Sequence, residues 1–328
     1  MIHHRPWSCV PARLLPVFLL LALVLPAMAA VDDVLMRGRV LILGDSITHA
    51  GTYVTFMAQR LARSHGRLPD LIAIGLASET ASGLSEADHP FPRPCIHERL
   101  GRALERIKPQ VVIACYGMND GIYHPLDDAR SQAFQQGITK LVEQCRAAGA
   151  SVIVLTPPPF DPQPVQAKLR PAGAADYSYK APFAGYDRVL AAYAQWELTL
   201  PAASARVVDL NGPMSAYTVR HRASDPAFAF SGDGIHPNDQ GQLLMADLLL
   251  TALGYPSVGA DLAQGVAAVT GDPLFAEIKR WRELRSNGWR DHVGYTREKT
   301  VTRAAIADVE EQAATLAQGI NTALGHQP

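Results

Sequence analysis

Five short, nearly continuous apolar runs recur along the chain, and each ends at a glycine, a proline cluster or an Asn-Gly pair. Runs of this kind predict strands that are buried on both faces, as in a parallel sheet covered by helices. The runs occupy residues 39–43, 71–74, 111–116, 151–155 and 205–210.

Segments with helical periodicity lie between these runs, roughly over residues 52–65, 96–107, 130–148, 185–200 and 237–253. In the last segment, Pro237 suits the first helical position and Gly254 the C-terminal cap. Alternation of strand and helix predicts an α/β fold with three layers, α/β/α, around a five-stranded parallel sheet. Functional groups are then expected beyond the carboxyl ends of the strands.

The N-terminal segment has the pattern of a secretory signal peptide. Arg5 and Arg13 precede an apolar run from Leu14 to Leu25, and Ala27-Met28-Ala29 follows as a small-x-small cleavage pattern. The run is shorter than the roughly 20 residues of a membrane-spanning helix. The sequence therefore predicts removal of residues 1–29, export to the periplasm or the extracellular space, and no stable membrane anchor.

Composition excludes several classes of protein. Of the 328 residues, 48% are hydrophobic and 19% charged, which is typical of a folded globular chain. The 30 Lys+Arg and 31 Asp+Glu residues give a net charge of −1. The chain therefore lacks the excess positive charge that is typical of nucleic-acid-binding proteins. Cleavage after Ala29 removes Cys9 and leaves Cys95, Cys115 and Cys145, which we interpret as buried thiols.

Polar clusters fall where the fold predicts a site. Gly44-Asp45-Ser46 follows the first strand, Ser78-Glu79-Thr80 the second and Gly117-Met118-Asn119-Asp120 the third. Asp233-Gly234-Ile235-His236 precedes the last helix. These loops are expected to converge at one edge of the sheet.

The clusters contain the groups that acyl transfer needs. Ser46 is a candidate nucleophile, and its hydroxyl needs a base such as the neutral imidazole of His236. Asp233, three residues earlier, can reach Nδ1 of that ring and fix its tautomer. Donors for a developing oxyanion are the N–H of Ser46, an N–H of the loop 75–78 and the side chain of Asn119.

Together these blocks resemble the SGNH (GDSL-type) hydrolases, serine esterases and lipases with a flavodoxin-like sheet. The first family block matches residues 44–48, the third matches 117–120 and the fifth matches 233–236. The resemblance implies that Ser46, Asp233 and His236 form the catalytic triad. It also implies that Asn119 and a glycine of the second block complete the oxyanion hole.

The second block departs from the family pattern. Counting back from Thr80, the glycine position is held by Ser78, and Gly75 is the nearest glycine. Because the donor is a backbone N–H, serine can serve if it tolerates the local backbone angles. We therefore assign the oxyanion role to Ser78, with Gly75 as second choice. The spacing of the histidines predicts no metal site, and no dinucleotide fingerprint indicates a cofactor.

The remaining segments predict substrate loops and a helical C-terminal extension. Residues 79–96 and 157–186 are proline-rich loops whose aromatic side chains either line a pocket or only cover the sheet edge. We place the hydrolase domain at 30–256 and the extension at 257–328, which either docks on the domain or forms a homodimer. The segment 289–297 is polar and aromatic, and its role is open.

The sequence thus predicts an exported serine ester hydrolase that works through an acyl-enzyme. Its substrate would be an acetylated polysaccharide or a lipid ester, and a sugar deacetylase is favoured because no long apolar loop is evident. Two alternatives stay open: an O-acyltransferase with the same site, and a non-catalytic protein that binds carbohydrate or a protein partner. Activity is expected to decline below roughly pH 6.5 as His236 becomes protonated.

Overall fold

The computed structural model describes residues 1–3 and 32–325 of the chain. Residues 32–325 belong to one compact unit, within which no helix is long and apolar enough to cross a membrane. Apart from its first three residues, the expected signal peptide, residues 1–29, falls outside the described residues. Export, cleavage after Ala29 and the domain boundary near residue 256 stay predictions.

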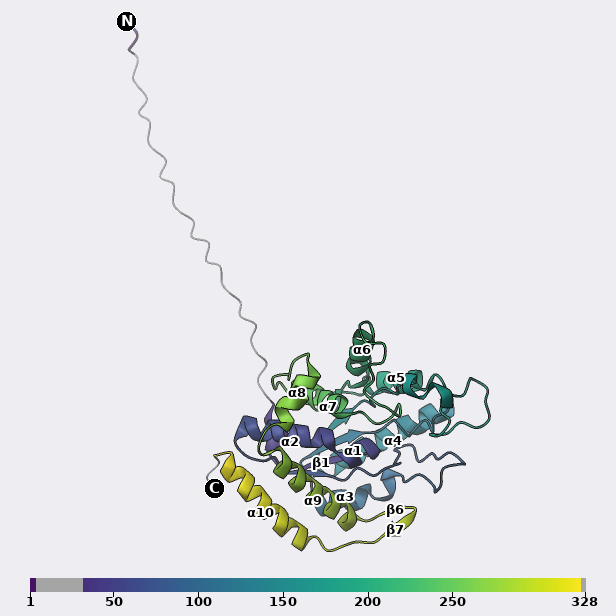
Figure 1. Cartoon of the computed structure of the whole chain (residues 1–328). Helices are drawn as coiled ribbons and strands as arrows, with labels where there is room; N and C mark the ends of the chain where they lie inside the picture. Colours follow the sequence, from purple (N-terminus) through teal and green to yellow (C-terminus); the bar gives the residue numbers. More distant parts are fainter. Residues whose placement is uncertain (4–31, 326–328) are drawn as a thin grey trace. The chain divides into compact units, whose positions relative to one another are not determined.

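A five-stranded parallel sheet forms the middle layer, with helices around it (Figure 1). Its strand order is β2-β1-β3-β4-β5. This is the flavodoxin-like order, so the predicted fold class is confirmed. The strands are shorter than the apolar runs at several ends: β1 (Val40–Gly44), β2 (Leu71–Ala73), β3 (Val111–Cys115), β4 (Ser151–Leu155) and β5 (Arg206–Val208).

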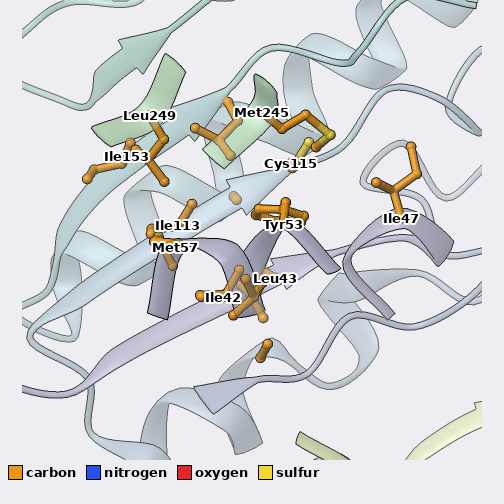
Figure 2. Close-up of a cluster of buried hydrophobic side chains, with 14 of the residues drawn as sticks. Ile42, Leu43, Ile47, Tyr53, Met57, Ile113, Cys115, Ile153, Met245 and Leu249 are labelled. Atoms are coloured by element: carbon orange, nitrogen blue, oxygen red, sulfur yellow. The ribbon is translucent and has the colours of Figure 1, made fainter. Parts of the chain in front are cut away.

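Burial on both faces explains the continuous apolar runs. Every residue of β1, β2 and β3 is buried, so the alternation of a half-exposed strand is missing. Figure 2 shows one part of this core, in which Ile42 and Ile113 of the sheet pack with Tyr53 and Met245.

The helices form the outer layers and a C-terminal group. They are α1 (Ser46–Ala50), α2 (Thr52–His65), α3 (Leu100–Ile107), α4 (Asp128–Ala147), α5 (Tyr186–Glu197), α6 (Asn211–Arg222), α7 (Asp239–Ala252), α8 (Leu262–Thr270), α9 (Phe275–Val293) and α10 (Ala307–Ala323). Helix α2 packs against α7, while α3, α4 and α5 form a row of neighbours. Right-handed crossovers between the parallel strands put these two groups on opposite faces of the sheet.

Several elements differ from the sequence prediction. Pro237 precedes helix α7 rather than beginning it, because Asn238 caps the helix by accepting from the Gly241 N–H. The Asn211-Gly212 pair was expected to be a break but opens α6. Pro213 is tolerated there, because the first turn of a helix needs no amide donor. Helix α8 and a hairpin of β6 (Tyr295–Arg297) and β7 (Lys299–Val301) were not predicted.

The C-terminal extension covers the β2 edge of the sheet. Helix α9 packs along β2 and against α2. Helix α10 packs on α9 (Figure 1). Ile278 and Trp281 are buried in this contact, and the Arg285 guanidinium donates to the carbonyl of Leu71. An edge strand covered in this way cannot pair with another chain.

Candidate active site

Ser46 lies at the sharp turn from β1 into α1. Asp45 caps this helix, and its carboxylate accepts from the Ile47 N–H at 2.9 Å. Gly44 allows the close turn, because a Cβ there would lie 2.2 Å from Oγ1 of Thr48. The N–H of Ser46 is in the first turn of α1, where the helix offers no acceptor.

Asp233 and His236 lie on the turn before α7 and reach Ser46. Nδ1 of His236 is 2.7 Å from Oδ2 of Asp233, and Nε2 of His236 is 2.8 Å from Oγ of Ser46. A carboxylate can only accept, so Nδ1 carries the ring proton and Nε2 is free to accept from the Ser46 hydroxyl. Oδ1 of Asp233 accepts from the N–H groups of Ile235 and His236 and from Ser231, which fixes the carboxylate.

The electrostatics of this chain of hydrogen bonds favour a charged carboxylate beside a basic ring. Burial alone would raise the pKa of Asp233, but the hydrogen bonds from His236, Ile235 and Ser231 hold it below its usual range. The hydrogen bond to Asp233 raises the pKa of His236 above 6.5, although partial burial opposes the shift. Burial raises the pKa of the neighbouring Asp45 to about 7.

Ser78 lies beside Ser46, and its backbone is in the left-handed region, with φ of 71°. This region favours glycine. Ser78 therefore adopts the backbone angles that the oxyanion role requires, but with some backbone strain. Its N–H has no hydrogen-bond acceptor among the described residues. Gly75 does not line the same cavity; it is tightly packed, since a Cβ there would lie 2.5 Å from the His49 nitrogen.

Asn119 is held with its amide in a fixed orientation. Its Oδ1 accepts from the Tyr123 hydroxyl at 3.1 Å, and its Nδ2 donates one hydrogen to the Glu79 carbonyl at 3.2 Å. The second hydrogen of Nδ2 is left for a ligand. Asp120 ties the Asn119 turn to the loop after Ser78, because Oδ1 accepts from the N–H groups of both Ala81 and Ser82.

A cavity of about 330 Å³ brings the candidate residues together. Ser46, His236, Ser78 and Asn119 line it. The rest of the wall is mostly aromatic and cationic and consists of Ala77, His89, Pro90, Phe91, Arg93, Tyr123, Tyr179, Ile235, Arg297 and Glu298. The loop 79–96 therefore lines the cavity, whereas the loop 157–186 contributes only Tyr179.

Sequence reasoning assigned no role to the charged side chains around the cavity. Arg93 pairs with Glu86 in the loop 79–96, with both side chains almost fully buried. Arg297 comes from the β6–β7 hairpin, within the segment 289–297 whose role was open. The mixture of aromatic and cationic residues in that segment was the signal, but no motif connected it to Ser46.

The described residues include no group of three or more His, Cys, Asp or Glu side chains that could hold a metal ion. His89 and His124 each contact aromatic rings, and His97 binds the Gly137 carbonyl. His49 lies in α1 with its pKa lowered to about 4 by burial and by nearby arginines. Cys95, Cys115 and Cys145 are free thiols, and the latter two are buried.

Solved structures to which the chain is similar include acetylxylan esterases. A catalytic mutant of an acetylxylan esterase from Geobacillus stearothermophilus is 16% identical, with a TM-score of 0.49 over 67% of this chain and 96% of that one. A gut microbial diltiazem-metabolizing enzyme is 22% identical, with a TM-score of 0.48 over 67% of this chain, which spans only 47% of that enzyme. An acetyl xylan esterase is 19% identical, with a TM-score of 0.45 over 65% of this chain and 98% of that one.

No curated protein matches the chain in sequence. The model of the GDSL-like lipase/acylhydrolase family matches residues 42–244, which include every residue of the Ser46, Asn119 and His236 blocks. That match covers more than half of the chain. The protein therefore belongs to the GDSL-like lipase/acylhydrolase family, a family of carboxylic ester hydrolases.

Proposed function

We propose that the protein is an exported serine esterase that removes short acyl groups from carbohydrate esters. The observation that carries the proposal is the unbroken chain of hydrogen bonds from Asp233 through His236 to Ser46, at 2.7 and 2.8 Å, beside a cavity. A serine hydroxyl held against a neutral imidazole is the arrangement that activates it as a nucleophile.

The reaction would proceed in two halves. Oγ of Ser46 attacks the ester carbonyl carbon while Nε2 of His236 takes its proton, and the N–H groups of Ser46 and Ser78 and Nδ2 of Asn119 stabilise the oxyanion. The tetrahedral intermediate collapses as His236 protonates the leaving alcohol, which leaves an acyl group on Ser46. Water, deprotonated by His236, then releases the acid and restores the serine.

Solvent access supports hydrolysis over transfer of the acyl group to a sugar hydroxyl. The side chains of His236 and Asp233 are 46% and 52% exposed, so water reaches the base directly. An acyltransferase must instead exclude water from the acyl-enzyme.

The size and lining of the cavity favour a substrate with a small acyl group and a sugar-like alcohol. Its volume of about 330 Å³ is at the small end of ligand pockets, which leaves little room for a long acyl chain. The rings of Phe91, His89 and Tyr179 form one aromatic group, with His89 contacting both neighbours. Such rings can stack on the apolar face of a sugar.

Ester turnover tests the proposal. The wild type should hydrolyse p-nitrophenyl acetate much faster than the Ser46→Ala variant and faster than long-chain esters, and it should release acetate from acetylated xylo-oligosaccharides. Equal turnover by wild type and Ser46→Ala would overturn the assignment. A preference for long acyl chains would indicate lipid esters as substrates. Transfer of the acyl group to an added sugar, in place of water, would indicate an acyltransferase.

Two further parts of the proposal rest on the sequence alone. Export requires cleavage after Ala29, so N-terminal sequencing of protein secreted by the producing cell should begin at Ala30. A homodimer through the C-terminal helices stays a prediction. Helix α9 already packs on β2 within the chain, and α10 packs on α9. A contact through α10 is therefore the form of the dimer that sedimentation should test first.

A further inference from the structure

Ser78 ends the loop 74–78, and every backbone carbonyl of this loop accepts a hydrogen bond. Four arginines donate to four of them: Arg99 to Ile74 at 2.8 Å, Arg290 to Gly75 at 2.8 Å, Arg297 to Ala77 at 2.9 Å and Arg93 to Ser78 at 3.3 Å. The fifth, Leu76, accepts from the Glu79 N–H at 3.1 Å. Arg290 and Arg297 both come from the C-terminal extension, outside the part of the chain that the family model matches.

Residues 76–79 form a turn whose geometry is unusual for its sequence. Positive φ at Ser78, the third residue, but not at Ala77, the second, defines a type II turn. Type II turns place glycine at the third position, whereas a residue with a side chain favours type I. The two types differ mainly by rotation of the central peptide, by about 150° in ψ of the second residue and about 170° in φ of the third.

That rotation matters because the central peptide carries the proposed oxyanion donor. In a trans peptide the carbonyl of Ala77 and the N–H of Ser78 point in opposite directions. Rotation into a type I turn would reverse both, so an acceptor would replace the donor that an oxyanion needs. The hydrogen bond from Nε of Arg297 to the Ala77 carbonyl exists only in the type II orientation.

Arg297 is itself held in place on the hairpin. Its guanidinium lies over the ring of Phe91, 4.9 Å from the ring centre, and NH1 is 3.6 Å from the carboxylate of Glu298. Its side chain is 30% exposed, so it is neither a core residue nor a free surface charge. The same contacts bring the extension and the loop 79–96 together at the cavity.

We propose that Arg297 is a positioning residue that holds the Ala77–Ser78 peptide in the orientation in which the Ser78 N–H can donate to the oxyanion. This inference rests on the proposed function, since it assigns Ser78 to the oxyanion hole. The C-terminal extension then contributes to catalysis through Arg297. Its hydrogen bond to the Ala77 carbonyl stabilises the type II turn, although serine and not glycine occupies the third position.

The test measures kcat and KM for p-nitrophenyl acetate with Arg297→Met, alone and combined with Ser78→Gly. Loss of one oxyanion donor lowers kcat by about 10²- to 10³-fold. We expect Arg297→Met to lower kcat by about 10-fold or more, up to that range, with a smaller change in KM. Because glycine adopts positive φ at no steric cost, the same substitution should cost several-fold less when Ser78→Gly is present.

Two comparisons separate positioning from other effects. Lys299→Met removes a cation from the same hairpin, opposite Arg297 in the β6–β7 pair, and should leave kcat unchanged because Arg297, and not Lys299, donates to the turn. Affinity for a trifluoromethyl ketone, which forms a tetrahedral adduct with the serine, should fall in parallel with kcat/KM in Arg297→Met. Affinity for the substrate alcohol should not.

Three results would overturn the inference: unchanged kcat in Arg297→Met, an equal loss with and without Ser78→Gly, or a rise in KM alone, which would make Arg297 a substrate contact. If Arg297→Met does not fold, Arg297→Leu, which also lacks a donor for the Ala77 carbonyl, decides by the same criteria. Failure of the proposed function looks different, since the wild type would then be no more active than Ser46→Ala.

Discussion

Nε2 of His236 lies 2.8 Å from Oγ of Ser46, although 190 residues separate the two along the chain. The pairing follows from the fold, because Ser46 follows β1, which lies between β2 and β3 in the sheet, and His236 precedes α7, which packs against α2. The contact therefore depends on the whole α/β core rather than on either loop alone.

The raised pKa of His236 should shift the acid limb of the pH profile of kcat/KM to higher pH. The base must be neutral, so kcat/KM should fall as the pH drops through the pKa of His236, which the hydrogen bond to Asp233 raises above 6.5. Replacement of that carboxylate by Asp233→Asn should shift the acid limb to lower pH and reduce kcat by about 10²- to 10⁴-fold. Asp225→Asn, on an exposed turn of the preceding segment, should do neither. A profile that is flat from pH 5 to 8 would exclude His236 as the base.

Asn119 should act on kcat more than on KM. Asn119→Ala removes one proposed oxyanion donor and is expected to lower kcat by about 10²- to 10³-fold. Tyr123→Phe removes only the hydroxyl that orients the amide, so a smaller loss is expected. Tyr193→Phe is the matched control, because that buried hydroxyl has no partner among the described residues and its removal should leave kcat unchanged. A loss of kcat in Tyr193→Phe as large as in Tyr123→Phe would contradict the orienting role.

The parts of the molecule that could be predicted from sequence are those encoded by local patterns. Apolar runs such as 111–116 mark buried strands, and the rule that sites lie beyond strand ends correctly predicts that Ser46 and Asn119 share one edge of the sheet. Helix α6 was missed because Asn211-Gly212 is a typical turn pair, and only the packing of Met214 and Tyr217 shows that the helix is stable.

Contacts made by side chains across long stretches of sequence could not be predicted in this way. Arg297 reaches the Ala77 carbonyl across 220 residues, and nothing periodic in its segment specifies that partner. The same is true of Arg99 and Glu79, whose pairing depends on how α3 packs under the sheet. From the sequence we could only state that Ser78 must tolerate the backbone angles of its loop. Its positive φ is set by the turn and not by the residue type.

Arg99 and Glu79 form a fully buried ion pair that should dominate local stability. Both side chains have no exposed surface, the guanidinium donates to both carboxylate oxygens at 2.6 and 2.7 Å, and the Tyr116 hydroxyl adds a third hydrogen bond. Removal of one partner leaves a buried charge, so Arg99→Met should lower the free energy of unfolding by about 3–5 kcal/mol.

The exposed pair of Arg102 and Glu98 is the control for this prediction. Its side chains are 37% and 42% exposed, so Glu98→Gln should change the free energy of unfolding by less than about 1 kcal/mol. Urea titrations of both variants give the comparison. The double variant Arg99→Met with Glu79→Met should lose less stability than Arg99→Met alone, since it buries no unpaired charge; similar effects of Arg99→Met and Glu98→Gln would contradict this account.

Two helical glycines should respond in opposite ways to the same substitution. Alanine is the better helix former by about 1 kcal/mol. In α10, Gly319 has no atom within 4 Å of an added Cβ, so Gly319→Ala should stabilise the protein by about 0.5–1 kcal/mol. In α4, a Cβ at Gly137 would lie 2.2 Å from the Ala81 carbonyl oxygen. The Ala81 backbone cannot retreat freely, because its N–H is bound to the buried carboxylate of Asp120.

Gly137→Ala should therefore destabilise the protein by about 1–3 kcal/mol in spite of its helix propensity. Because the Ala81 segment continues from the Ser78 turn and is tied to the Asn119 turn through Asp120, the variant should also lower kcat, whereas Gly319→Ala should not. Thermal unfolding and p-nitrophenyl acetate turnover of the two variants check both points. Equal stabilisation by the two substitutions would show that the close approach of α4 to the site loop does not constrain it.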